Sequence, residues 1–552
     1  MHPGRNNAIL ISIVFLFSCL AARVYYLQIC QGQSLSRLAS SQRMLNSQIE
    51  KPRGEILDRN LIPFTDREKR IFIVIKPLLL RDRDEDVKRV CDVLGLDFVK
   101  TKSEIDSKSE PLLFQTDEEK KRIIMEKGLQ GISVVYSLKR YSENSIARHV
   151  TGYLNGIDRT GEAGIEKAYE DVLEFRQNDR VGVVTDARSN IIQGLGYRLN
   201  AAGSRGRGLN VKLTLDYHIQ KIVEDVMDRA GISGAVVVED VYTGDIAAMA
   251  SRPNFEQDSV ERYLNSSNDE LFNKAVASYN LGSIFKIVDA AVFLTYADLT
   301  DETYDCSGSI RVGGKEFKCS SYDRGGHGFL DLKSAFAVSC NPFFINAGIK
   351  VGWRNLVNMA QKLGLGDFSG IRAQGVDESS GRLPGAKEYY TPGDTANIAI
   401  GQGEILATPM QVADMVATVA NGGIKNKVNI VDSIVDPDGN KVRNIRVKAG
   451  ERVIPREIGD RLKELMEEVT LNGTGTKAGL YGYGGSGGKT GSAETGRYVN
   501  DKPVVHAWFA GYFPKHSPRY SIAVFVEDGK SGGQVAAPIF EEIAEEIMKK
   551  GY

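Results

Sequence analysis

The longest apolar stretch of the chain lies near its amino terminus. Residues 8–22 carry no charge, and after Arg23 the apolar pattern continues to Ile29. At about 1.5 Å per residue, a helix over 7–29 can cross a hydrocarbon core of roughly 30 Å. A cleaved signal peptide or a buried helix is the alternative, but Arg23 and two tyrosines stand where a small-residue cleavage site would follow. We therefore expect a transmembrane anchor over 7–29, with residues 1–6 as a cytoplasmic tail.

Beyond the predicted anchor, the pattern of hydrophobic and polar residues changes twice. Residues 30 to about 200 alternate short apolar runs with dense charge, which is typical of solvated helices and turns. A polar, Gly-rich segment at 200–208 then indicates a linker. We predict one domain over 30–205 and a second over 206–552, both outside the membrane, because Arg5 and the amino terminus favour an inside N-terminus.

Apolar residues of the second domain follow the spacing of β-strands in some segments and the spacing of α-helices in others. Apolar runs at 235–241 and 246–250, and again at 504–513 and 520–526, are separated by turn-forming residues and are typical of β-hairpins. Residues 536–550 carry apolar side chains at helical spacing. Strands near both ends with helical material between them predict an α+β domain, whose central antiparallel sheet is flanked by helices.

Composition narrows the functional classes. Hydrophobic residues make up 42% of the chain and charged residues 26%, which is ordinary for a globular protein. The formal net charge of -1 gives no electrostatic reason to expect nucleic acid as a partner. The six cysteines are too few and too scattered for a disulfide-stapled scaffold.

A serine and a lysine three residues apart, Ser283 and Lys286, form the first chemical motif. At the start of a helix these side chains would share one face. A serine hydroxyl becomes a good nucleophile only when a base takes its proton, and a lysine can be that base where its surroundings lower its pKa. The helix N-terminus would also favour negative charge developing on Ser283. We therefore predict a catalytic nucleophile and its base.

A second motif contains Ser339 and Asn341, with Cys340 between them. The hydroxyl of Ser339 could relay a proton toward a leaving group. The amide of Asn341 could hold both Lys286 and a substrate carbonyl, because it offers a donor and an acceptor.

The third motif runs from Lys489 through Thr490 and Gly491 to Ser492. On a strand that lines a cleft, Lys489 and Thr490 could bind a substrate carboxylate, and Gly491 would let a substrate backbone lie close. The backbone N–H of Ser492, together with that of Ser283, could form an oxyanion hole.

Each motif alone is weak, and only their order and spacing in one domain is specific. Two competing patterns fail on context. A G-x-S-x-G pattern at 484–488 leads into Lys489 rather than into an apolar helix. A phosphate-binding loop would need glycine where Tyr483 stands.

In these motifs, and over nearly its whole length, the chain resembles the class B penicillin-binding proteins. The likeness extends to blocks at 22–29, 53–60, 147–153, 161–166, 213–220, 401–403 and 408–411. It departs from the family at Leu281 and Ser142, where proline is usual. The resemblance implies an elongated pedestal (dimerisation-like) domain over 30–205 and a serine penicillin-binding/β-lactamase-like transpeptidase domain over 206–552.

The resemblance also implies an activity. Ser283 would attack the D-Ala-D-Ala end of a peptidoglycan stem peptide, and the acyl group would pass to a neighbouring amine. β-Lactams, which mimic this dipeptide, would acylate Ser283 as inhibitors. The chemistry requires no cofactor. Expected partners at the bacterial cytoplasmic membrane are a membrane-embedded glycosyltransferase and other wall-synthesis proteins.

Three other functions use the same kind of domain. A serine β-lactamase must hydrolyse its acyl-enzyme, and no E-x-x-L-N segment of the kind used for this follows Asn341. A D,D-carboxypeptidase would usually lack the pedestal. A wall-synthesis scaffold would not need three intact motifs.

A possible metal site lies between the first two motifs. Cys306, Cys319 and His327 fall in one short segment, and Asp323 lies four residues before His327. Two thiolates, an imidazole and a carboxylate suit tetrahedral Zn²⁺, with Asp323 as fourth ligand. The alternatives are a disulfide between Cys306 and Cys319 or two free thiols. We expect Cys340 only to pack behind the cleft.

Overall fold

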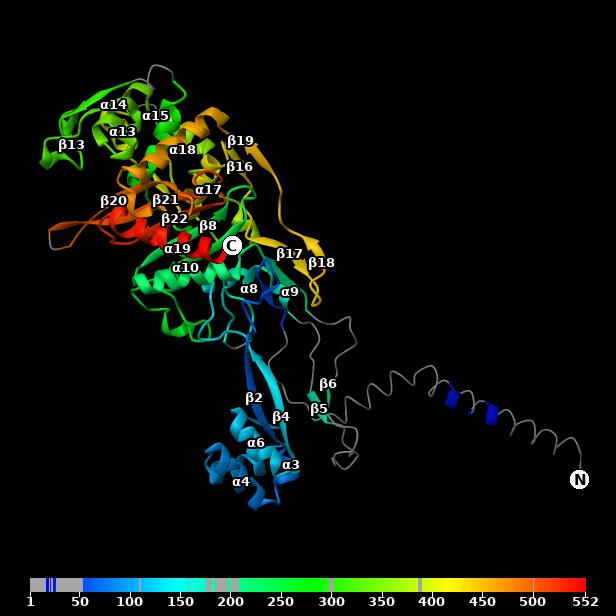
Figure 1. Cartoon of the computed structure of the whole chain (residues 1–552). Helices are drawn as coiled ribbons and strands as arrows, with labels where there is room; N and C mark the ends of the chain where they lie inside the picture. The colour runs from blue at the N-terminus through cyan, green and yellow to red at the C-terminus, as the bar shows by residue number, and fades with distance from the viewer. Residues whose placement is uncertain are drawn as a thin grey trace, which may run out of the picture. The chain divides into compact units, whose positions relative to one another are not determined.

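The computed structural model describes residues 16–18, 20, 23–25, 53–108, 111–156, 158–174, 181–183, 197–199, 208–296, 302–385, 390–499 and 501–552 (Figure 1). Most of the anchor predicted at 7–29 lies outside these residues, as does most of the linker predicted at 200–208. Within the described ranges, no helix is both long enough and apolar enough to cross a membrane.

The chain packs as two units. The first comprises Met1–Arg53, Glu68–Lys139 and Phe175–Arg207, and the second comprises Gly54–Arg67, Arg140–Glu174 and Gly208–Tyr552. Two segments of the predicted pedestal therefore pack with the C-terminal unit. One reason is that β1 (Ile56–Leu57) pairs in parallel with β7 (Asn210–Leu213). The boundary at residues 205 and 206 stays a prediction.

The first unit contains an antiparallel sheet of order β3-β2-β4 packed against short helices. Ile73 and Ile75 on the sheet share a core with Val87 and Val90 on an amphipathic helix. The strands are β2 (Glu68–Ile75), β3 (Leu112–Thr116) and β4 (Ile132–Lys139), and the helices are α3 (Pro77–Leu80), α4 (Asp84–Leu94), α5 (Phe98–Ser107) and α6 (Glu118–Glu126). A separate pair is β5 (Val181–Val183) with β6 (Tyr197–Leu199).

The second unit is built on a five-stranded antiparallel sheet of order β20-β21-β22-β8-β9. Its strands are β8 (Gly234–Asp240), β9 (Ile246–Arg252), β20 (Gly487–Val499), β21 (Lys502–Phe513) and β22 (Tyr520–Val526). The two predicted hairpins are confirmed, and β22 pairs with β8 to join them. The helix predicted at 536–550 is α19 (Ala537–Lys550).

Alternate residues of this sheet face two different helical layers. Val236 and Val238 of β8 pack with α19 and with α10 (Tyr217–Ala230). Ala235 and Val237 pack instead with α11 (Lys286–Phe293) and α17 (Pro409–Ala420). Because side chains alternate across a strand, a nearly continuous apolar strand can bury both of its faces. The predicted antiparallel sheet with flanking helices is thus confirmed.

The remaining elements surround this core. A second sheet of order β1-β7-β17-β18 adds β17 (Val431–Val435) and β18 (Lys441–Asn444). Two-stranded pairs are β10 (Tyr279–Asn280) with β15 (Leu406–Ala407), β11 (Tyr304–Cys306) with β14 (Gly328–Leu330), β12 (Ser309–Val312) with β13 (Lys315–Lys318), and β16 (Ile424–Asn426) with β19 (Gly450–Arg452). The other helices are α7 (Arg148–Thr151), α8 (Gly164–Ala168), α9 (Glu170–Leu173), α13 (Leu332–Ala337), α14 (Asn341–Val351), α15 (Trp353–Lys362), α16 (Pro392–Ile398) and α18 (Arg456–Leu471).

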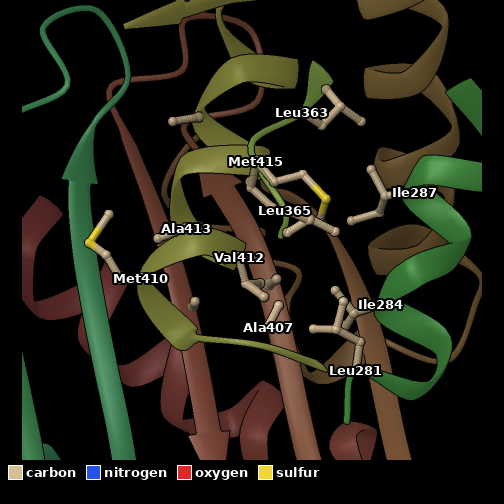
Figure 2. Close-up of a cluster of buried hydrophobic side chains, with 14 of the residues drawn as sticks. Leu281, Ile284, Ile287, Leu363, Leu365, Ala407, Met410, Val412, Ala413 and Met415 are labelled. Carbon is tan, nitrogen blue, oxygen red and sulfur yellow. The ribbon is translucent and has the colours of Figure 1, made fainter. Parts of the chain in front are cut away.

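The segment that carries Ser283 is anchored by its apolar side chains. It forms a 3-10 turn, η4 (Gly282–Phe285), that runs straight into α11. Leu281, Ile284 and Ile287 are fully buried, and Figure 2 shows them in one cluster with side chains of α17. This packing fixes the backbone from which Ser283 and Lys286 project.

A buried ion pair ties Arg140–Glu174 to Gly54–Arg67 within the second unit. The Nε of Arg140 donates to Oε1 of Glu166 at 2.8 Å, and its guanidinium also bonds the carbonyl of Gly54 at 2.7 Å and the carboxylate of Asp66. Arg140 is 4% exposed and Glu166 is fully buried. Removing one partner would leave a buried charge without its counterion.

We predict that Arg140→Met lowers the free energy of unfolding of the second unit by about 3–5 kcal/mol, because the buried carboxylate of Glu166 would lose its guanidinium partner. Urea unfolding followed by tryptophan fluorescence measures this, since Trp353 and Trp508 both lie in this unit. The matched control is Arg229→Met, which removes an exposed pair with Glu542 and should cost less than about 1 kcal/mol. Equal losses in the two variants would contradict the prediction.

Candidate active site

Ser283 lies in η4, and Lys286 is the first residue of α11. Gly282, just before Ser283, has a φ of 53°, and a β-carbon there would lie 2.5 Å from the carbonyl oxygen of Ser492. Only glycine therefore lets β20 approach the segment of Ser283 this closely. Ser283 is partly exposed and Ser492 is exposed.

Lys286 joins the first motif to the second. Its Nζ donates to Oδ1 of Asn341 at 2.7 Å, to the carbonyl of Ser339 at 2.8 Å and to Oγ of Ser339 at 3.2 Å. The Nδ2 of Asn341 in turn donates to the carbonyl of Lys318 at 3.1 Å. The structure thus brings Lys286, Ser339 and Asn341 together. No hydrogen bond between Ser283 and Lys286 occurs in the described part of the chain.

The backbone at Ser339 is left-handed, with a φ of 56°. Such a conformation is unfavourable for a residue with a β-carbon and persists where the surroundings impose it. Here Ser339 lies in the short turn between α13 and α14, and the N–H of Cys340 donates to the carbonyl of Ala335 at 2.9 Å. The turn therefore presents Ser339 and Asn341 to the same lysine.

The third motif lies on β20. Lys489 is fully buried, its Nζ donates to the carbonyl of Thr490 at 3.2 Å, and it lies 5.5 Å from the centre of the Phe336 ring. The Oγ1 of Thr490 lies 2.6 Å from Oγ1 of Thr474. A β-carbon on Gly491 would lie 2.7 Å from Cγ1 of Ile284. β20 therefore packs directly against η4, which carries Ser283.

Burial changes the acid–base chemistry of both lysines. It lowers the pKa of Lys286 to about 8, although Cys340, Cys319 and Asp289 act in the opposite direction. It also lowers the pKa of Lys489 well below its usual range, with the positive charge of Lys286 adding to the effect. A neutral amine on Lys286 is therefore accessible near neutral pH, which a general base requires.

A cluster of thiols and one imidazole lies behind the second motif. The ligand atoms of Cys306, Cys319, His327 and Cys340 all lie within 4.8 Å of one another. The predicted fourth ligand, Asp323, is exposed and is not part of this group. Cys340, which we expected only to pack, takes its place because the turn after α13 directs it toward Cys319 at 3.9 Å. All four described cysteines, including Cys306 and Cys319, are free thiols.

Two residues near the site escaped the sequence interpretation. Asp289 is fully buried one turn after Lys286, and neither carboxylate oxygen has a hydrogen-bond partner in the described chain; burial raises its pKa well above the usual range. Helical spacing from Lys286 could have indicated it. Thr474 reaches Thr490 from beyond α18, and no local pattern indicates that contact.

Two family models match the chain. The model described as "Penicillin binding protein transpeptidase domain" matches residues 234–545, and the "Penicillin-binding Protein dimerisation domain" matches residues 48–205. The chain belongs to the penicillin-binding protein transpeptidase family. The class B resemblance of the sequence is thereby confirmed, with a dimerisation domain followed by the transpeptidase domain of the family.

Named relatives belong to the same family. Stage V sporulation protein D of Bacillus subtilis is 30% identical over an alignment that covers 97% of this chain and 84% of that protein. Peptidoglycan D,D-transpeptidase MrdA of Acinetobacter baumannii is 26% identical, with 96% of this chain and 86% of that protein covered.

Solved members of the family have the same architecture. One, from work on "Structural coordination of polymerization and crosslinking by a peptidoglycan synthase complex", superposes with a TM-score of 0.75 at 26% identity and covers 99% of both chains. Penicillin-binding protein A from M. tuberculosis, as a penicillin G acyl-enzyme complex, gives a TM-score of 0.61 at 26% identity, covering 74% of this chain and 94% of that one.

We predict that the reactivity of Ser283 rises with pH to a plateau with a midpoint near 8, because only the neutral amine of Lys286 can accept the serine proton. Labelling rates with a fluorophosphonate, which reacts with activated serines, measure this between pH 6 and about 10, a range on both sides of that midpoint. Ser283→Ala controls for labelling elsewhere. A rate that does not change with pH would exclude Lys286 as the base.

Proposed function

We propose that this chain is a peptidoglycan D,D-transpeptidase that works through an acyl-enzyme on Ser283. The observation that carries the proposal is the hydrogen bonding of the buried Lys286 to Ser339 and Asn341 beside Ser283. Family membership and the names of the relatives support the same reaction class.

The first half-reaction acylates the enzyme. The neutral amine of Lys286 accepts the proton of Ser283, whose Oγ bonds to the carbonyl carbon of the penultimate D-alanine. The peptide C–N bond then breaks, and the terminal D-alanine leaves with a proton relayed through Ser339. In the second half-reaction an amine of a neighbouring stem peptide attacks the ester, and Ser283 regains its proton.

The residues that line the cleft bind the parts of the donor peptide that do not react. Lys489 and Thr490 bind the terminal carboxylate of the donor peptide, and Gly491 lets the strand that carries them pack against the segment of Ser283. The backbone N–H groups of Ser283 and Ser492 bind the oxyanion, where preorganised donors stabilise the transition state most. The close approach of β20 to Gly282 supports this pairing.

The same proposal includes the cellular setting. Residues 7–29 anchor the chain in the bacterial cytoplasmic membrane with the amino terminus inside, and the transpeptidase domain acts outside the membrane. We propose that a membrane-embedded glycosyltransferase supplies the glycan strands. The architectural match to a chain from work on a peptidoglycan synthase complex supports this assembly.

We predict that benzylpenicillin forms one stable covalent adduct with the full-length chain, because the second half-reaction needs an amine that penicillin does not supply. Intact-mass spectra after brief exposure measure it, and Ser283→Ala should carry no adduct. Intact penicillin with no adduct would favour a scaffold. Destroyed penicillin with no adduct would favour a β-lactamase. With a D-Ala-D-Ala stem peptide and an amine acceptor in place of penicillin, release of D-alanine without cross-linking would favour a carboxypeptidase.

We further propose that Cys306, Cys319, His327 and Cys340 hold a structural Zn²⁺. Tetrahedral zinc with Cys and His ligands places sulfur and nitrogen atoms about 3.5 to 3.8 Å apart. The Sγ of Cys319 lies 3.9 Å from Sγ of Cys340 and 3.4 Å from Nδ1 of His327, and Sγ of Cys306 lies 3.9 Å from the same nitrogen. These distances fit four ligands around one ion.

The site is structural because four protein ligands would leave no open position for a substrate. Three strand ends and one helix start supply the ligands, so the ion would fix segments that have little core of their own. Cys340 lies between Ser339 and Asn341, and the metal would therefore hold the second cleft wall. The acylation chemistry itself uses no step at the metal.

We predict about one zinc ion per chain purified without added metal, measured by inductively coupled plasma mass spectrometry. Cys340→Ser and Cys319→Ser should each lower the zinc content strongly, because a three-ligand site binds zinc more weakly. Asp323→Asn is the matched control and should keep the ion. Metal-free wild-type protein, or loss of zinc in Asp323→Asn, would overturn the assignment.

A further inference from the structure

Thr474 connects two walls of the cleft that no motif connects. It follows α18, and its N–H donates to the carbonyl of Ala337 at 3.0 Å, two residues before Ser339. Its hydroxyl lies 2.6 Å from the hydroxyl of Thr490 on β20. One residue thus contacts both the turn that carries Ser339 and the strand that carries Lys489.

The segment around Thr474 is held tightly in this position. A β-carbon on Gly473 would lie 2.4 Å from the carbonyl oxygen of Ala337, so only glycine allows the segment to pass here. The N–H of Gly475 donates to the carbonyl of Val469 at 3.0 Å and fixes the other side. The hydroxyl of Thr474 therefore meets Thr490 from a defined direction.

A hydroxyl has one proton and two lone pairs, so only two arrangements of this pair exist. If Thr490 donates to Thr474, its proton points at Thr474 and not at a bound carboxylate, and the proton of Thr474 turns to the carbonyl of Ala337, at 3.4 Å, or to solvent. If Thr474 donates to Thr490, the proton of Thr490 is free to face the cleft. A separation of 2.6 Å is that of a good O–H···O bond.

We infer that Thr474 is a positioning residue that donates to Thr490 and so directs the Thr490 proton at the carboxylate of the substrate. A carboxylate only accepts hydrogen bonds, so it selects the second arrangement. The inference rests on the proposed function, because it takes Thr490 as part of the carboxylate subsite. Thr474 does not itself need to touch the substrate.

The test compares two thioesters of benzoyl-D-alanine on the full-length chain in detergent. One has a thioglycolate leaving group, which carries a carboxylate, and the other has the uncharged thioglycolamide. Thr474→Val should lower kcat/KM for the acid about fivefold, the worth of one net hydrogen bond, and leave the amide within about twofold. Because Thr474 is exposed, water replaces part of the lost bond, which keeps the effect modest.

Further variants separate positioning from folding. Thr474→Ser keeps the hydroxyl and should restore the kcat/KM for the acid. Thr476→Val makes the same change two residues further on, at an exposed threonine. It should leave kcat/KM unchanged for both thioesters. The double variant Thr474→Val with Thr490→Val should have the same kcat/KM for the acid as Thr490→Val alone, since the two residues act as a unit.

The outcomes distinguish the positioning role of Thr474 from the proposed function on which it rests. Equal losses for acid and amide in Thr474→Val, no loss, or additive losses in the double variant would overturn the positioning role. If Thr490→Val itself fails to discriminate between acid and amide, the carboxylate subsite of the proposed function is wrong. A Ser283→Ala chain that still turns over the thioesters would instead overturn the acyl-enzyme.

Discussion

The dry environment of one lysine amine is the constraint on which the rest of the active site depends. Lys286 is fully buried, and its Nζ has three acceptors, all from Ser339 and Asn341. Burial alone would expel a charged amine, whereas three acceptors hold it in place. Burial lowers the pKa of Lys286 to about 8, with Cys340, Cys319 and Asp289 acting in the opposite direction, and this value is low enough for a base. More water around Lys286 would raise its pKa and leave less neutral amine to act as a base. Fewer acceptors would leave the position of its Nζ less well defined.

The fold supplies that environment from two directions. Apolar residues of η4 and α11 pack on α17 (Figure 2), while the antiparallel sheet behind them sets the position of β20. Because β20 lies at the edge of the sheet, its outer side is free to line a cleft, and Gly282 lets it come close to Ser283. The same packing therefore excludes water and assembles the reacting groups.

The second wall of the cleft contains a turn with an unfavourable backbone conformation. Ser339 and Asn341 project from a turn with a left-handed residue, and a strained turn needs support from outside itself. Cys340, within this turn, belongs to the thiol and imidazole cluster, and Thr474 bonds the carbonyl of Ala337 just before the turn. We interpret both as supports that hold the two walls at the spacing which a peptide substrate requires.

The sequence by itself determined the chemistry and the local elements. Both hairpins, the C-terminal helix and the three motifs depend on residue order and period, which are local properties of a chain. Residue type was also sufficient to indicate that Cys306, Cys319 and His327 belong together. Only the tertiary structure decided the long-range contacts: Cys340 beside Cys319 in place of Asp323, Thr474 beside Thr490, and residues 54–67 and 140–174 in the second unit. The physical reason is that such contacts join segments far apart in the chain, and their geometry follows from how whole elements pack.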